Sequence, residues 1–246
     1  MNYLDNDMPK CFIGYDRAES AAFYTLCHSI WRRASRPVHI IPIMLSELKG
    51  LMWRDRDPMQ SNDFSFSRFL VPYLCNYEGK ALFIDADMMV VDDINNLFDL
   101  FDDSYSVQCV KHNHVPIEEV KYLGNVQTKY NKKNWSSVLL FNNSKCSALT
   151  PEYINTASGL DLHQFKWLDS DSEIGDLPLR WNFLVSYYHD LPIEEISLLH
   201  WTEGGAYFND YKNCPYADIW QDEYKDMIHV TQPASVHYSE VSEKIV

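Results

Sequence analysis

Two carboxylates that follow one apolar run have the spacing of a metal site. Asp85 and Asp87 lie within Lys80-Ala-Leu-Phe-Ile-Asp-Ala-Asp-Met-Met-Val-Val-Asp92, directly after the apolar residues 81–84. A short run of this kind is typical of a strand buried on both faces. In extended chain, side chains at i and i+2 point the same way, so the carboxylates repel each other and lose hydration. A divalent cation removes both penalties, and oxygen ligands suit Mg²⁺ or Mn²⁺. The alternative is an ordinary acidic turn after a strand.

A histidine later in the chain is a candidate third ligand. Residues 196–199 indicate a short strand that ends at His200, and Gly204 and Gly205 follow. Two carboxylates and one imidazole would fill half of an octahedral shell around Mn²⁺ or Mg²⁺ and leave the other positions for phosphate oxygens. Taken alone, His200 is equally compatible with a hydrogen-bonded structural histidine.

These candidate ligands need a sheet that brings strand ends together. Residues 11–15 indicate a strand, and residues 17–33 have apolar positions at helical period. Asp16 and Glu19 have the spacing of a capping box, so Tyr15 and Asp16 are either a ligand-binding turn or a helix cap. Ligands of open parallel sheets bind at the carboxyl ends of the strands. We therefore expect the ends at Asp16, Asp85 and His200 to meet at one rim.

The remaining elements predict an α/β fold in one domain that spans residues 1–246. Further strands are expected at 38–44, where Pro42 indicates an edge or a bulge, and at 107–110 and 136–141. Helices are expected at 66–77, at 92–98 and from Pro151. Residues 111–133 are expected to form a polar surface excursion, and the aromatic and acidic tail to wrap the domain. Arg68 lies off the apolar stripe of its helix, where it could be solvated or could reach a ligand.

Composition excludes several classes of protein. The chain has 246 residues, 46% of them hydrophobic, as in a folded globular domain. Its formal net charge of −14 argues against nucleic acid and anionic membranes as partners, so an anionic ligand would need a local cation. The six cysteines contain no CxxC pattern, which favours reduced thiols in a cytoplasmic protein. We expect no signal peptide, because the first seven residues are acidic and not apolar, and no transmembrane segment, because no apolar run is long enough.

The scattered motifs resemble the glycosyltransferases of the GT-A fold, and most closely family 8, the retaining group that includes glycogenin and bacterial galactosyltransferases. The stretches that carry the resemblance are Phe12-Ile-Gly-Tyr-Asp16, Ser65-Phe-Ser-Arg68, Leu82-Phe-Ile-Asp-Ala-Asp87, Trp135-Ser-Ser-Val-Leu-Leu-Phe-Asn142, Asp169-Ser-Asp171, Leu177-Pro-Leu-Arg-Trp-Asn182 and the segment from His200. Among them, the Asp85-Ala-Asp87 strand, which resembles the DxD motif, is the most specific. The implied fold is a mixed, mostly parallel sheet flanked by helices.

The resemblance implies a hexosyltransferase-type enzyme that moves a sugar from a nucleotide-sugar, most simply a UDP-sugar, to a glycan or glycolipid acceptor of unknown identity, with retention of configuration. It implies Mn²⁺ or Mg²⁺ on Asp85, Asp87 and His200, bridging the donor diphosphate. Asp169 and Asp171 become the candidate catalytic residues, which bind the sugar hydroxyls, unless solvation alone explains them. The resemblance places these residues against the donor: Tyr15, Asp16, Arg68, Asp85, Ser136, Asn182, Gly204 and Gly205.

The chain also departs from the family pattern. The closing motif of the family usually continues to a lysine, whereas residues 204–208 read Gly-Gly-Ala-Tyr-Phe. The metal and Arg68 are therefore expected to neutralise more of the diphosphate charge. Ser170 stands where a Gln is usual. Two alternatives stay open: a non-catalytic domain that binds nucleotide-sugar or glycan, and a haloacid-dehalogenase-like phosphatase with Asp85 as its nucleophile.

Overall fold

The computed structural model describes residues 8–57, 60–113 and 131–229, and all structural statements refer to these ranges. The strands are β1 (Lys10–Tyr15), β2 (His39–Met44), β3 (Lys80–Ile84), β4 (Met88–Val90), β5 (Val107–Cys109), β6 (Val138–Asn142), β7 (Ile174–Asp176), β8 (Phe183–Leu184) and β9 (Leu198–His200). The α-helices are α1 (Ser20–Arg33), α2 (Val71–Leu74), α3 (Ile94–Phe98), α4 (Pro151–Thr156), α5 (Gly159–His163) and α6 (Ala217–Ile228).

The strands form two sheets. The larger sheet has six strands in the order β2-β1-β3-β6-β5-β7, and the smaller has three in the order β4-β9-β8. In the larger sheet β1 runs parallel to β2 and β3, and β5 runs parallel to β7, while β6 is antiparallel to both neighbours. This mixed, mostly parallel sheet confirms the predicted fold class.

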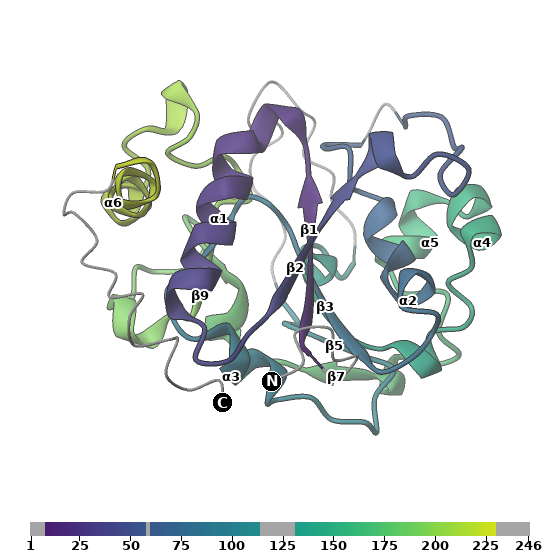
Figure 1. Cartoon of the computed structure of the whole chain (residues 1–246). Helices are drawn as coiled ribbons and strands as arrows, with labels where there is room; N and C mark the ends of the chain where they lie inside the picture. The colour runs from purple at the N-terminus through teal and green to yellow at the C-terminus, as the bar shows by residue number, and fades with distance from the viewer. Residues whose placement is uncertain (1–7, 58–59, 114–130, 230–246) are drawn as a thin grey trace, which may run out of the picture.

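Helices cover both faces of the larger sheet. In Figure 1, α1 lies on one side of β1 and β3, with α6 outside it, and α2, α4 and α5 lie on the other side. The smaller sheet lies on the side of α1, where α1 packs against β4. A strand buried between such layers needs apolar residues on both faces, which explains the continuous apolar runs of β3 and β6.

The smaller sheet separates two apolar clusters because successive strand residues point to opposite faces. Met88, Val90 and Leu198 face the main core, which is built on the larger sheet. Met89 and Leu199 face a second cluster that contains Trp201 and Trp220. The outer face of the smaller sheet is therefore buried by α6 and the loops before it, instead of being exposed to water.

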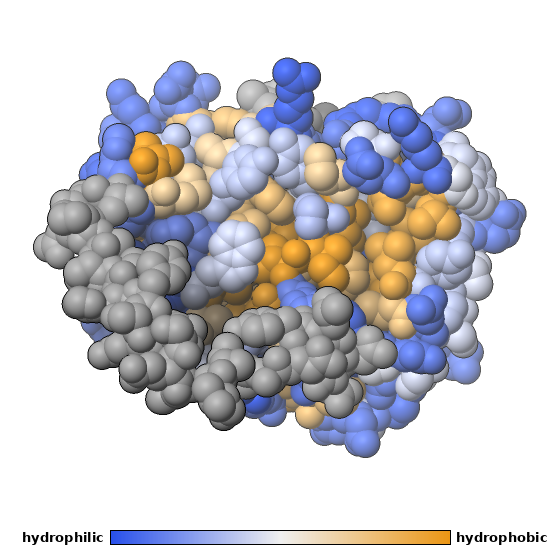
Figure 2. Space-filling model, viewed as in Figure 1, coloured by the Kyte–Doolittle hydropathy of each residue, from blue (hydrophilic) through white to orange (hydrophobic). Residues whose placement is uncertain are grey.

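Several local predictions are confirmed. Asp16 precedes a short 3-10 turn and α1, and Thr150 caps α4, which starts at Pro151. β2 is an edge strand, as Pro42 indicated, because the missing N–H is tolerated there. Apolar residues are visible over the middle of the face that carries this strand (Figure 2), where Ile40 and Pro42 line a shallow hollow beside α1.

Other local predictions differ from the structure. The helix expected over 66–77 consists of a 3-10 turn, Ser67–Leu70, and the single turn of α2. Residues 217–228 form α6, although only a wrapping tail was expected; Ala217 and Trp220 are its buried apolar residues. The excursion expected over 111–133 falls mostly on residues outside the described ranges. Among the described helices, none is both long and apolar enough to cross a membrane.

Candidate metal centre

Asp85, Asp87 and His200 come together at the junction of the two sheets. Asp85 and Asp87 lie in the turn between β3 and β4, and His200 ends β9, where it pairs directly with Met88. All three side chains are buried, and each offers a ligand atom within 4.8 Å of the other two. The three residues that the sequence predicted as metal ligands are therefore adjacent, although His200 belongs to the smaller sheet and not to the same rim of one sheet.

The environment of His200 leaves one ring nitrogen suited to a metal. The Asn182 side-chain N–H donates to the Asn134 carbonyl (3.2 Å), so its amide oxygen faces His200 Nδ1 at 2.8 Å. With that oxygen accepting the Nδ1 proton, Nε2 is the ring nitrogen that can offer a lone pair to a metal. Nε2 makes no hydrogen bond within the described residues and lies 3.4 Å from Asp87 Oδ1. A lone pair beside a carboxylate oxygen calls for a cation between them, so these residues fit a divalent metal.

Arg68 partly neutralises the acidic pair. Its Nη1 lies 2.7 Å from Asp85 Oδ1. Burial raises the pKa of the Asp85 carboxyl above its ordinary value, Arg68 lowers it, and the Asp87 carboxylate raises it again. A cation bound to both carboxylates would act in the same direction as Arg68, by stabilising their charged forms.

Arg68 is held in place by backbone carbonyls. Its Nε donates to the Ser65 carbonyl (3.1 Å) and its Nη1 to the Ser136 carbonyl (2.8 Å). The side chain is buried, so the alternative of a solvated helix position is wrong. These bonds also fix Ser136, a predicted donor-binding residue, beside the metal centre.

Tyr15 and Asp16 have structural contacts at the start of α1. Asp16 accepts hydrogen bonds from the Ala18 and Asp63 backbone N–H groups, at 2.8 and 3.0 Å. The Tyr15 ring packs edge-on against Phe23, with ring centroids 5.2 Å apart. The helix-cap interpretation of Asp16 is confirmed, and contact of this pair with a nucleotide base stays a prediction.

Asp169 and Asp171 lie in an exposed loop. Asp171 accepts a hydrogen bond from Lys132 Nζ at 2.5 Å, which lowers the pKa of the Asp171 carboxyl. The Asp169 backbone N–H donates to Glu173. Neither carboxylate lines the hollow beside the metal centre. Their catalytic role stays a prediction.

The two glycines of the closing segment are explained by neighbouring rings. A Cβ on Gly204 would lie 2.9 Å from the Tyr211 ring, and the φ of Gly204 is +129°. A Cβ on Gly205 would lie 2.5 Å from the Tyr207 ring. Both positions therefore require glycine without any ligand, so these contacts do not test a donor-binding role.

A polar hollow of about 60 Å³ opens beside the metal centre. Asp85, Asp87 and Arg68 line it together with Lys133 and His163, and serine and threonine hydroxyls complete its wall. Burial, followed by the nearby Arg68 and Lys133 charges, lowers the pKa of His163 well below its ordinary value. The neutral imidazole makes a hydrogen bond of 2.7 Å with Ser136 through Nδ1.

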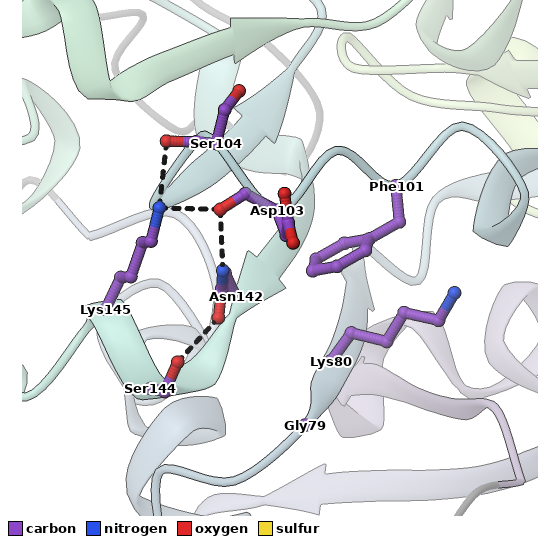
Figure 3. A pocket seen from close by; sticks show the side chains of 8 residues that line it. All are labelled: Gly79, Lys80, Phe101, Asp103, Ser104, Asn142, Ser144 and Lys145. Atoms are coloured by element: carbon purple, nitrogen blue, oxygen red, sulfur yellow. Dashed lines mark hydrogen bonds between the residues drawn. The ribbon is translucent and has the colours of Figure 1, made fainter.

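A larger hollow at the opposite end of β3 does not resemble a ligand site. It measures about 720 Å³ and is lined by Lys80, Phe101, Lys145 and their neighbours (Figure 3). Lys145 Nζ donates to the Asp103 and Ser104 carbonyls at 2.6 and 2.9 Å, and Lys80 Nζ donates to the Phe98 carbonyl at 3.1 Å. The ammonium groups of both lysines are thus hydrogen-bonded to backbone carbonyls. Among the described residues, the hollow contains no group of metal-binding side chains.

Comparison with known proteins shows the family and the fold to which this chain belongs. The sequence is 44% identical over 224 residues to Protein CDI of Arabidopsis thaliana, a match that covers 88% of this chain and 86% of the plant protein. The chain belongs to the Protein CDI family. No family model matches the sequence.

Solved glycosyltransferases share the fold of this Protein CDI relative. The bifunctional enzyme WbbM has a TM-score of 0.60 at 14% identity, and GlyE of Streptococcus pneumoniae has 0.58 at 17%. The matches cover 91% and 88% of this chain but only 53% and 60% of those proteins. The galactosyltransferase LgtC, solved with donor and acceptor sugar analogues, has a TM-score of 0.53 at 14% identity, covering 92% of this chain and 98% of LgtC. The predicted GT-A fold is confirmed, and membership of family 8 stays a prediction.

Sequence reasoning missed Lys133 and His163. Lys133 stands in a polar tract without periodicity, and His163 is a lone histidine that ends a short helix. Neither has a spacing signal that points to a partner. The Lys132-Lys133-Asn134 segment, which precedes a predicted strand, offers only a weak signal, since a basic pair before a strand is also common on solvated surfaces.

Proposed function

We propose that this chain is a metal-dependent glycosyltransferase that uses a nucleoside-diphosphate sugar, with residues 1–246 forming one catalytic domain. The observation that carries the proposal is the buried Asp85, Asp87 and His200 triad with the His200 lone pair facing Asp87, within a GT-A fold. Mn²⁺, with Mg²⁺ as the alternative, fits this donor set of two carboxylates and one imidazole. UDP-sugar as donor and retention of configuration are further parts of the proposal.

Each part of the site has a distinct task in this proposal. Asp85, Asp87 and His200 hold the metal, and Asn182 orients the imidazole. A bound divalent cation supplies Lewis-acid stabilisation of the negative charge on the leaving diphosphate. Arg68 forms an ion pair with Asp85 and donates a hydrogen bond to the Ser136 carbonyl, which holds Ser136 in place. Asp169 and Asp171 contact the sugar, while Tyr15 and Asp16 border the nucleoside.

The phosphatase alternative is not favoured, because Asp85, which would be its nucleophile, is ion-paired with Arg68 and the solved proteins that share the fold are glycosyltransferases. The non-catalytic binding domain remains the main competitor. Cytosolic action is the remaining part of the proposal, and it is supported by six free cysteines.

Thermal unfolding with UDP, GDP, CDP and their sugars, with and without Mn²⁺, tests the proposal. A nucleotide at a hundred times its Kd stabilises the native state by about 2.7 kcal/mol, which corresponds to a rise in Tm of roughly 5–10 °C for a chain of this size. We expect such a rise only when Mn²⁺ is present, and its loss in Asp87→Asn.

The exposed carboxylate of Asp222 gives a matched control, since Asp222→Asn removes one charge far from the site. Absence of stabilisation by every nucleotide in the wild-type protein would contradict the proposal. Slow Mn²⁺-dependent hydrolysis of the stabilising sugar nucleotide would distinguish a transferase from a non-catalytic binding domain.

A further inference from the structure

The hollow beside the metal centre contains more positive charge than the sequence indicated. Two cationic side chains line it: Arg68, which contacts Asp85, and Lys133, which is only 8% exposed. Lys133 thus brings a second basic side chain to the wall of the hollow that Asp85 and Asp87 also line.

The backbone around Lys133 is strained. Lys132 and Asn134, on either side of it, both have left-handed conformations, with φ of 64° and 62°. Asparagine tolerates this region, but for lysine it costs about 1–2 kcal/mol. Such strain persists only where the surrounding structure fixes it, and it clusters at functional sites.

Both sides of this turn are anchored. On one side, Lys132 Nζ donates to the Gln164 carbonyl (3.0 Å) and to Asp171 (2.5 Å). On the other side, the Asn134 carbonyl accepts from Asn182, which orients His200. Lys133 is thereby held at a fixed position relative to the metal ligands.

The described residues that line the hollow include two acidic side chains, Asp85 and Asp87, and two basic ones, Arg68 and Lys133. A divalent cation on the triad would add two positive charges to this site. Serine and threonine hydroxyls in the wall offer hydrogen bonds to the same ligand. A ligand with two adjacent anionic phosphates complements this charge.

We propose that Lys133 binds the diphosphate of the donor and supplies the cation that the closing segment 204–208 lacks. This inference rests on the proposed function and deepens it, since it assigns the diphosphate to the side of the hollow that Lys133 occupies. Arg68 is then left to neutralise Asp85, which agrees with its contacts to that carboxylate and to two carbonyls.

Calorimetric titration of Lys133→Met with UDP at saturating Mn²⁺ tests the inference, with uridine as the matched ligand without phosphates. We expect UDP affinity to fall by about tenfold to a hundredfold, the usual loss for a hydrogen bond between charged groups. Affinities for uridine and for Mn²⁺ alone should stay within about twofold. Lys145→Met, which removes a lysine at the opposite end of the sheet, should bind UDP as the wild type does.

The outcomes separate this inference from the function on which it rests. If wild-type protein binds neither UDP nor GDP or CDP with Mn²⁺, the proposed function fails. If wild-type protein binds one of them and Lys133→Met binds it equally well, only the role of Lys133 is wrong. The role is also wrong if Mn²⁺ affinity falls by the same factor as nucleotide affinity. Lys133→Gln replaces Lys133→Met if the methionine variant does not fold.

Discussion

The strongest prediction concerns Asn182, which contacts the candidate metal ligand His200 and is itself buried. Its side chain is fully buried, accepts the His200 Nδ1 proton and donates to the Asn134 carbonyl. Asn182→Leu keeps a similar volume and removes both hydrogen bonds. The imidazole is then free to rotate or to change tautomer, so Nε2 no longer faces Asp87 with its lone pair.

The magnitude follows from these two contacts. Loss of the partner that orients a metal-binding histidine typically weakens metal affinity 10- to 100-fold, which is about 1.4–2.7 kcal/mol. Each buried group left without its hydrogen bond costs about 1–3 kcal/mol of stability, so the free energy of unfolding should fall by about 2–6 kcal/mol. Asn182→Asp keeps an acceptor opposite His200 Nδ1, so its Mn²⁺ affinity should remain near that of the wild type.

Titration of Mn²⁺, followed by electron paramagnetic resonance of the free ion, measures the affinity directly. Asn143→Leu is the matched control, because Asn143 is also fully buried and donates to the Glu78 carbonyl (2.8 Å), far from the metal centre. It should lose stability and keep Mn²⁺ affinity. Folded Asn182→Leu protein that binds Mn²⁺ as tightly as the wild type would refute the assignment of the His200 tautomer.

Two further predictions concern stability. Glu223→Gln should lower the free energy of unfolding in urea by about 2 kcal/mol, because the buried carboxylate on α6 binds His28 (2.6 Å) and Arg33 (2.7 Å) on α1. The loss is moderate because both partners keep some contact with water. Asp222→Asn, at an exposed position, should change the free energy of unfolding by less than about 0.5 kcal/mol, and equal losses in the two variants would argue against this contact. The pKa of His163 is depressed in the folded state, so below pH 6.5 the unfolded chain binds a proton on this imidazole that the folded chain does not. Stability therefore falls as pH falls, by about 1.4 kcal/mol per pH unit until the pKa of the folded state is reached. In urea unfolding at pH 7.5, 6.5 and 5.5, the free energy of unfolding should decline less steeply with falling pH in His163→Gln than in the wild type. Identical slopes would show that protonation of His163 does not cause the decline.

The fold was largely predictable because its central strands leave clear patterns. β3 and β6 contain continuous apolar runs, and Asp16 provides the side-chain cap that the sequence indicated. The candidate metal ligands were predictable for a related reason. An acidic pair after a buried strand and a histidine after another are conspicuous, since such positions are otherwise apolar or solvated.

What the sequence could not give was the pairing of distant segments. α6 was missed because its buried stripe is interrupted by Glu223, whose partners lie on α1 about 190 residues earlier in the chain. Asn182 was predicted to touch the donor, yet its hydrogen bonds are with His200 and the Asn134 carbonyl, and only the fold reveals that His200 is its neighbour. Lys133 was missed because its burial depends on a left-handed turn that no local pattern indicates.

The position of the triad between two apolar clusters links ligand binding to the cohesion of the whole chain. Asp85 follows a strand of the main core, whereas His200 ends a strand whose outer face belongs to the second cluster. A cation held by both would be a reversible cross-link between these two parts, and its contribution would grow with the logarithm of free metal concentration. The C-terminal layer, with β9 and α6, would then be the part of the molecule whose local unfolding depends on the free metal concentration.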